Sequence, residues 1–180
     1  TVPATVPYLT APANHPLRLE TRPTDRLNVG LVWSGGHLYK HNHLRSTTLD
    51  SFQPLLDVAN VGFYSLQKGV PALEIADLRL TDRLYNLDDQ LKSFADTAAA
   101  IDQLDLVITV DTSVAHLAGA MGKAVWLLLP HVADWRWMLN RSDTPWYPTM
   151  YLFRQAKPGD WAGLIQQVRQ ELRVKVATLG

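Results

Sequence analysis

The sequence has no cysteine and no net charge, and each absence excludes a class of protein. Without cysteine there is no disulfide, no zinc–thiolate site and no cysteine nucleophile. The 17 basic residues balance the 17 acidic ones, which argues against a nucleic-acid partner, although a local basic loop remains open. The longest apolar stretch is Ala124–Pro130. It is far too short for a transmembrane helix, which needs about 20 apolar residues. No signal peptide is visible, so we expect a cytoplasmic protein with no membrane span.

Motifs of several common enzyme classes are also missing from the sequence. It has no G-x-x-x-x-G-K-[ST], which excludes a P-loop NTPase, and no G-x-G-x-x-G after the first expected strand, which weakens a nicotinamide or flavin interpretation. The absence of G-x-S-x-G argues against a nucleophile-elbow hydrolase. One loop carries His37, His41 and His43, but their spacing matches no metal-ligand pattern and no acidic residue lies within the loop. We therefore expect neither a metal ion nor a cofactor.

What is present fits one globular domain. A chain of 180 residues, 47% hydrophobic and 19% charged, is long enough to bury a core. Residues 1–27 are rich in proline, which leaves little room for regular structure. Because the sequence also starts at Thr1, we expect residues 1–27 to be a linker from a missing N-terminal region. Residues 28–180 then form the domain.

Short apolar runs alternate with helical patterns along that domain. Strands are expected at 28–33, 61–65, 84–87, 106–110, 124–129 and 151–153. Helices are expected at 49–59, 70–78, 93–104, 112–121 and after Asp160. In the helix that Ser93 would cap, we expect Phe94, Ala98, Ile101 and Leu104 to face inward. This order predicts an α/β fold with a doubly wound, mostly parallel, Rossmann-like sheet. Ligands of such sheets bind beyond the carboxyl ends of the strands.

The residues that follow the fourth expected strand are the first candidates for a site. Asp111, Thr112, Ser113 and His116 lie where that strand leads directly into a helix. The first amides of a helix lack intrahelical partners, and with the helix dipole they can bind a phosphate. The alternative is that Asp111 only caps the helix and that His116 is an ordinary surface or core histidine.

Other strand ends carry weaker signals. After the first strand, Ser34, Gly35 and Lys40 belong to a glycine-containing basic loop that could bind an anion or could simply be solvated. Gln67 and Lys68 follow the second strand, where an ordinary polar turn is the simpler interpretation. An aromatic stretch, residues 130–148, either packs over the sheet edge or lines a site.

Four segments occur in an order that resembles a known family: 29–35, 63–69, 104–119, and Asp134–Trp137 together with Pro145–Pro148. Together they resemble the C-terminal, nucleotide-sugar-binding half of GT-B glycosyltransferases. The resemblance is strongest to the heptosyltransferase-like domain that follows tetratricopeptide repeats in bacterial proteins. It covers about residues 29–172, and its D-T-[SG]-x-x-H element is moderately specific.

The resemblance implies a donor site, with no metal. The implied donor-binding residues are Ser34, Gly35, Lys40, Gln67, Lys68, Asp111, Thr112, Ser113 and His116. The helix start would receive the diphosphate, and His116 and Lys40 would stabilise the leaving group. Ser113 stands where heptosyltransferases usually have glycine. The catalytic base would belong to an N-terminal acceptor domain that this chain does not contain.

The implied function is the donor-binding domain of an enzyme that transfers a sugar from a nucleoside-diphosphate sugar to an acceptor hydroxyl. Its partners would be the nucleotide sugar, an acceptor glycan or protein, the acceptor domain and tetratricopeptide repeats. The fragment alone would bind nucleotide weakly and show little or no transfer. Two alternatives remain: a GT-B-like nucleotide-sugar epimerase, and a non-catalytic interaction module with the same fold.

Overall fold

The structure is a computed structural model that describes residues 5–22, 24–36, 40 and 42–179, so His37 and His41 lie outside the described residues. Its centre is a six-stranded, all-parallel sheet in the order β3-β2-β1-β4-β5-β6. The strands are β1 (Leu27–Val32), β2 (Val61–Ser65), β3 (Tyr85–Asn86), β4 (Leu106–Val110), β5 (Val125–Leu129) and β6 (Met150–Arg154). The expected doubly wound, Rossmann-like sheet is confirmed.

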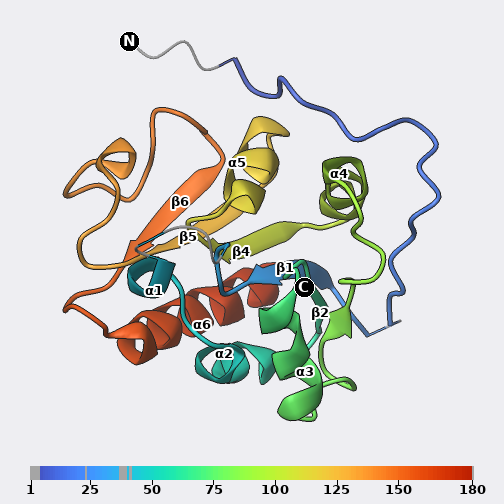
Figure 1. Cartoon of the computed structure of the whole chain (residues 1–180), viewed down its shortest axis with the longest axis horizontal. Coiled ribbons are helices and arrows are strands. Elements are labelled where there is room, and N and C mark those ends of the chain that lie inside the picture. The colour runs from blue at the N-terminus through green and yellow to red at the C-terminus, as the bar shows by residue number, and fades with distance from the viewer. Residues whose placement is uncertain (1–4, 23, 37–39, 41, 180) are drawn as a thin grey trace.

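Helices cover both faces of this sheet (Figure 1). On one face lie α4 (Phe94–Asp102) and α5 (Ser113–Ala120). On the other lie α2 (Leu49–Leu56), the continuous turns η1 (Val70–Leu73) and α3 (Glu74–Asp77), and the long α6 (Trp161–Ala177). Two short elements, α1 (Asn42–Arg45) and η2 (Trp135–Trp137), lie in the loops after β1 and β5.

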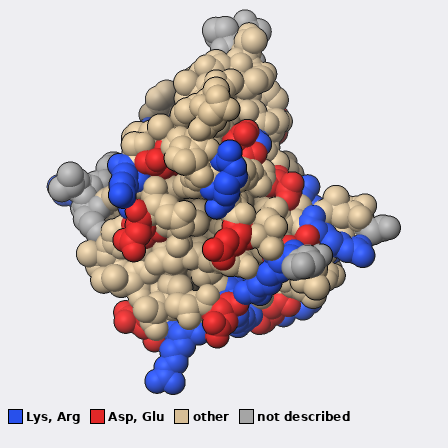
Figure 2. Space-filling view, turned by 90° about the vertical axis from the view of Figure 1, so that its right-hand side faces the viewer, with Lys and Arg blue, Asp and Glu red and all other residues tan. Residues whose placement is uncertain are grey.

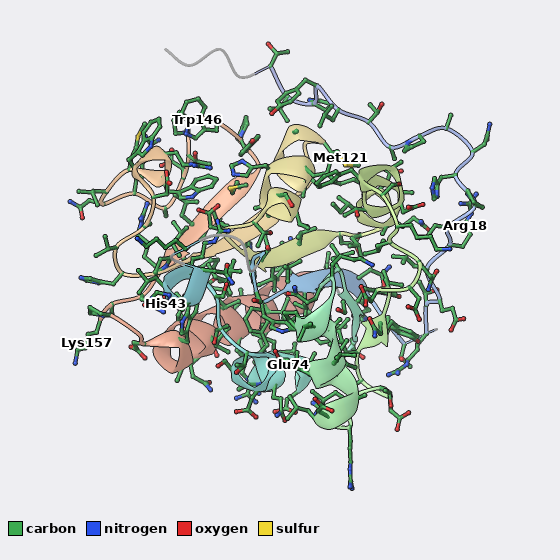
Figure 3. The ribbon with its side chains drawn as sticks, in the orientation of Figure 1. Arg18, His43, Glu74, Met121, Trp146 and Lys157 are labelled. Carbon is green, nitrogen blue, oxygen red and sulfur yellow. The ribbon has the colours of Figure 1, made fainter. Side chains whose placement is uncertain are left out.

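The central strands are buried on both sides because each one contributes to two cores. Alternate residues of β4 show this: Val107 packs with α4 and α5, whereas Leu106 and Ile108 pack with α2 and α6. A polar contact connects the starts of α2 and α3: the backbone N–H of Leu49 donates to Glu74 Oε2 at 2.6 Å. Figure 3 shows Glu74 between α2 and α3. Continuous apolar strands are therefore required here, and they made the sheet predictable.

The start of α4 follows the predicted cap but not the predicted burial. Ser93 and Asp96 form a reciprocal capping box, in which each side chain accepts from the other residue's backbone amide. Phe94 was expected to face inward; that expectation is wrong, because Phe94 is 65% exposed. The cap places Phe94 at the first helical position, on the outer side of the turn, while Ala98 and Ile101 are buried.

The proline-rich segment before β1 lies along the α4–α5 side of the domain (Figure 1). Leu17 is buried in the core on that side, and Gln103 of α4 hydrogen-bonds the backbone of both Leu17 and Leu19. The amide of Tyr8 donates to the carbonyl of Ala120 at the end of α5. We call residues 5–22 the strap. On the face that includes the strap, charges of both signs are interspersed (Figure 2).

A loop from 130 to 148, here called the aromatic loop, connects β5 to the edge strand β6. Its Tyr147 packs against α5 so closely that a Cβ placed on Gly119 would lie 2.5 Å from the tyrosine ring. The loop also reaches the open edge of the sheet, where the Leu152 amide donates to the Ser142 carbonyl at 2.6 Å. The aromatic loop is therefore part of the packed structure.

This close packing predicts that Gly119→Ala destabilises the protein. The added methyl group would overlap the Tyr147 ring, and overpacking of this kind costs about 1–3 kcal/mol. Chemical denaturation should show that loss in the free energy of unfolding. Gly36→Ala is the matched control, because a Cβ there meets none of the described residues within 4 Å. Equal stability of the two variants would contradict the packing that we describe.

Candidate functional site

Among the described residues, a larger and a smaller cleft open at the carboxyl ends of the strands. The larger, the α5 cleft, has a volume of about 570 Å³ and lies where the ends of β1 and β2 meet the start of α5. Its polar and small lining residues are Ser34, Gly35, Gly36, Gln67, Lys68, Gly69, Thr112 and Ser113. The smaller, the loop cleft, has about 260 Å³ and is lined by Asp111, Asp134 and Arg136 among others. Arg45 lines both clefts.

The position of the α5 cleft follows from the topology. Strand β1 lies between β2 and β4. The connection after β1 passes to the α2 face of the sheet, whereas the connection after β4 passes to the opposite face, which carries α5. A crevice forms at such a switch point, and this is where open α/β sheets bind ligands. The volume of the α5 cleft lies within the usual range of about 300–1,000 Å³ for ligand pockets.

The N-terminus of α5 forms one wall of this cleft. Thr112 is its N-cap residue in an extended conformation, but its side chain makes no capping hydrogen bond. Instead Thr112 Oγ1 lies 3.2 Å from Thr109 Oγ1, in the interior. The side chain of Ser113 is exposed. Among the described residues, no side chain caps the first amides of α5, and this end of the helix, with its positive dipole, lines the cleft.

Gln67 joins the ends of β1 and β2. Its side chain is buried, and Gln67 Oε1 accepts from the amides of Trp33 at 3.1 Å and Ser34 at 2.9 Å. Gln67 Nε2 donates back to the Ser34 carbonyl at 3.1 Å. The side-chain amide therefore holds the floor of the cleft in shape, with its hydrogen-bonding groups already engaged.

Other cleft residues are held by neighbours as well. The amide of Gly35 donates to Ser46 Oγ at 2.9 Å, and its carbonyl accepts from Asn42 Nδ2. Lys68 Nζ forms an ion pair with Asp88 at 2.7 Å. The hydrogen bond from Lys68 holds the pKa of Asp88 below its usual value. Lys68 thus brings a cation to the cleft that one carboxylate already partly neutralises.

Asp111 connects β4 to the aromatic loop and does not cap α5. Its carboxylate is buried, and Asp111 Oδ2 accepts from the indole Nε1 of Trp137 at 3.0 Å. Asp111 Oδ1 lies 3.8 Å from His116 Nε2. Trp137 is itself buried and stacks on the His116 ring, with 5.4 Å between ring centroids.

His116 lies between α5 and the aromatic loop, and it is not among the residues that line the α5 cleft. His116 Nδ1 is 3.0 Å from Tyr147 Oη, and Nε2 is 3.4 Å from Arg136 Nη1. Burial lowers the pKa of His116 below its ordinary 6.5, and the charge of Arg136 lowers it further. The carboxylates of Asp111 and Asp134 oppose the shift without reversing it. The ring is therefore neutral at pH 7.

The turn η2 holds Arg136 and Trp135 in defined positions. Arg136 donates to both oxygens of Asp134, and the Arg136 carbonyl accepts from the Trp146 indole at 2.9 Å. Burial raises the pKa of Asp134, but hydrogen bonds from the amide and guanidinium of Arg136 outweigh it and leave the pKa lowered. Trp135 is 79% exposed beside the loop cleft. The turn ends at Met138 with φ of 54°, a conformation that is costly outside glycine.

Eight of the nine residues that the sequence singled out lie on or beside these clefts. The α5 cleft brings together Ser34, Gly35, Gln67, Lys68, Thr112 and Ser113, while Asp111 lines the loop cleft and His116 contacts its wall. Lys40 is exposed and is not one of the described residues that line either cleft.

Two cations at the clefts escaped the sequence analysis as site residues. Arg45 was one of several cations in a loop, and Arg136 was one residue of an aromatic stretch. Each loop follows a strand end, which is one signal. Arg136 also lies within Asp134–Trp137, one of the segments that carry the family resemblance.

In the described part of the chain, no group of three or more His, Cys, Asp or Glu side chains is arranged to hold a metal ion. None of its helices is both long enough and apolar enough to cross a bilayer.

Comparison with known proteins supports the fold. No family model matches the sequence. Over 149 residues the chain is 28% identical to Protein FlbA of Caulobacter vibrioides, a match that covers 81% of this chain and 25% of FlbA. The solved structure of E. coli ADP-heptose LPS heptosyltransferase II is similar over 86% of this chain and 46% of its own, with a TM-score of 0.58 and 14% identity.

The two matches share one property: this chain spans only about a quarter of FlbA and less than half of the heptosyltransferase. The expected likeness to half of a GT-B heptosyltransferase is therefore shown for the fold. Neither match shows the expected tetratricopeptide repeats, which stay a prediction.

The contacts of Gln67 predict a structural defect when its amide is removed. Gln67→Leu would leave the amides of Trp33 and Ser34 without their acceptor, and each buried unpaired group costs about 1–3 kcal/mol. We expect the free energy of unfolding to fall by about 2–4 kcal/mol in denaturant titration. The exposed Gln166→Leu on α6 is the control and should stay within about 0.5 kcal/mol of the wild type. An unchanged stability for Gln67→Leu would refute the bridging role.

The lowered pKa of His116 predicts an acid-dependent loss of stability. As pH falls below the ordinary 6.5, the unfolded chain binds a proton at His116 before the folded protein does, so stability decreases until the folded pKa is passed. In an NMR titration, the His116 ring should have a pKa below 6.5. Asp111→Asn should lower that pKa further, because it removes a negative charge that favours the imidazolium. A wild-type pKa above 6.5 would contradict the description.

Proposed function

We propose that this domain binds the donor of a glycosyl-transfer reaction, a nucleoside-diphosphate sugar, with the diphosphate at the start of α5. The observation that carries the proposal is the α5 cleft itself. Three segments that are distant in sequence meet there around the N-terminus of α5. The side chain of Thr112, the N-cap residue of this helix, makes no capping hydrogen bond. Free helix amides, glycine backbone and nearby cations are the groups that recognise phosphate oxygens.

The two clefts together suit a ligand with two parts. The α5 cleft also has apolar walls, Val32, Leu66 and Val114, which suit the flat face of a nucleoside. The loop cleft offers Asp111 and Asp134, whose carboxylates can accept hydrogen bonds from hydroxyl groups. Arg45 borders both clefts, at the place where a diphosphate would join the two parts of the ligand. The likeness to the E. coli ADP-heptose LPS heptosyltransferase II supports the choice of ligand class.

The chemistry that this arrangement supports is leaving-group stabilisation without a metal. As the bond between the sugar and the diphosphate breaks, negative charge builds up on the diphosphate. Fixed backbone donors and cations stabilise such charge before it forms, and one donor typically contributes about 2.7–4 kcal/mol. We expect the base that activates the acceptor hydroxyl to come from a separate acceptor-binding domain, so that this domain alone binds nucleotide and transfers little sugar.

The epimerase alternative requires carboxylates that are available for proton transfer. Both carboxylates of the loop cleft are engaged, Asp111 by the Trp137 indole and Asp134 by Arg136. This favours sugar transfer over epimerisation. The alternative of a non-catalytic interaction module makes a different prediction, because it requires no nucleotide binding at all.

The test is binding of ADP, UDP and GDP, measured by thermal shift and by amide NMR signals. A ligand that binds only the folded state raises the melting temperature. At least one of the three nucleotides should do so, and it should shift the amide signals of Ser34, Thr112 and Ser113. If all three nucleotides leave these signals unmoved at saturation, the proposal fails.

One substitution separates binding from stability. Ser113→Glu places a carboxylate in the first turn of α5, where it favours the helix by about 0.3–1 kcal/mol but repels a diphosphate. We expect unchanged or higher stability and at least about tenfold weaker nucleotide binding. Gln170→Glu, exposed on α6 across the sheet, is the control for net charge and should bind normally. Normal binding by Ser113→Glu would place the nucleotide elsewhere.

A further inference from the structure

His116 has a hydrogen-bonding partner at each ring nitrogen, and the partners determine where its proton lies. Arg136 Nη1, at 3.4 Å from Nε2, carries hydrogens only and cannot accept. His116 Nε2 must therefore be the acceptor in that contact. Because the neutral ring has one N–H, the proton lies on Nδ1 and is donated to Tyr147 Oη at 3.0 Å.

Tyr147 is suited to receive that proton because its own position is fixed. Its ring packs against Gly119 of α5, where a Cβ would overlap it. Burial raises the pKa of Tyr147, and a hydrogen bond with Tyr8 of the strap raises it further, so the hydroxyl stays protonated. Tyr147 can thus accept from His116 and donate onward to Tyr8.

Arg136 is at the other end of this chain of hydrogen bonds and lines the loop cleft. The guanidinium has five N–H groups. Asp134 takes two of them, and His116 takes a third. Among the described residues these are the side-chain partners of Arg136, which leaves N–H groups for a ligand in the cleft. A guanidinium held on two sides has lost most of its rotational freedom before a ligand arrives.

We propose that His116 is a positioning residue: as the neutral Nδ1–H tautomer, fixed by Tyr147, it holds the Arg136 guanidinium at the wall of the loop cleft for contact with the bound nucleotide sugar. This rests on the proposed function and changes the part of His116 in it. The resemblance implied a direct contact that stabilises the leaving group, whereas the geometry gives His116 an indirect action through Arg136.

The groups around His116 support this assignment. Asp111 and Asp134 supply negative charge, Arg136 supplies positive charge, and the Trp137 ring stacks on the imidazole. A protonated ring would lose its acceptor at Nε2 and would place a second cation 3.4 Å from the guanidinium. Protonation therefore releases Arg136, and binding of a nucleotide sugar weakens as pH falls through the pKa of His116.

The first test needs no ligand. Two-bond ¹H–¹⁵N NMR spectra of the histidine rings distinguish the two neutral tautomers from the imidazolium. At about pH 7 we expect His116 as the Nδ1–H form. Tyr147→Phe removes the acceptor and should shift the ring toward the Nε2–H form, and Tyr151→Phe, on an exposed tyrosine of β6, should leave it unchanged. An Nε2–H ring or an imidazolium in the wild type would overturn the proposal.

The second test compares two substitutions of His116, each of which keeps one of its two contacts: the one with Arg136 or the one with Tyr147. The side-chain oxygen of Gln in His116→Gln can still accept from Arg136, whereas Asn in His116→Asn keeps only a donor near Tyr147. Binding of ADP-glucose, UDP-glucose and GDP-mannose is measured by calorimetry at pH values on both sides of the pKa of His116. These ligands are chosen because their diphosphates do not titrate in that range. For the sugar nucleotide that binds best, we expect His116→Asn to bind about tenfold more weakly and His116→Gln to retain most of the affinity.

The outcomes separate this proposal from the proposed function. If none of the three nucleotide sugars binds the wild type, the proposed function fails, while the tautomer measurement still decides how His116 is held. If binding is normal in the wild type and both variants lose it equally, or if affinity rises as pH falls, His116 contacts the ligand directly. Either result would overturn its positioning role.

Discussion

The buried hydrogen bond from the Trp137 indole to the Asp111 carboxylate is the interaction on which the site depends. It joins the end of the central strand β4 to the middle of the aromatic loop. With Trp137 fixed, the neighbouring Arg136 lies at the cleft and the His116 ring has a surface to stack on. Hydrogen bonds to a charged group are stronger than neutral ones, and inside the protein they are weakly screened.

The polar groups at the carboxyl edge of the sheet fall into two sets. Gln67, Asn42 and Asp111 each make hydrogen bonds within the protein, and these bonds keep the strand ends and loops in place. The amides of Ser113 and Val114 and the exposed side chain of Ser113 have no such partner among the residues that the structure describes. A rigid frame around unused donors is what a preorganised anion site requires, because little has to reorganise when charge arrives.

The fold was predictable from the sequence because parallel sheets require apolar strands of a recognisable length. Leu106–Val110 is buried at every position, and a short run in which four of five residues are β-branched is typical of a strand. The helix starts were readable too, since Ser93 and Asp160 both accept hydrogen bonds from the first turns they precede. Phe94 was misjudged because helical periodicity does not tell how a cap orients the first turn.

The site was only partly predictable. Residues at strand ends could be selected by position, but the partner of each side chain depends on contacts between distant segments. Gln67 was a candidate for ligand contact until the structure showed its bonds to Trp33 and Ser34. The pairing of Asp111 with Trp137 spans 26 positions and crosses an irregular loop. Nothing in local composition or spacing identifies such a pair.

The aromatic loop has one more consequence, which concerns self-association. Strand β6 is the outermost strand of the sheet, and an open strand edge can recruit another chain. The carbonyl of Ser142 occupies the amide of Leu152 on that edge. The same segment that forms one wall of the loop cleft therefore also covers part of the β6 edge. A change in this segment that reshaped ligand preference could at the same time expose that part of the edge to strand pairing with another chain.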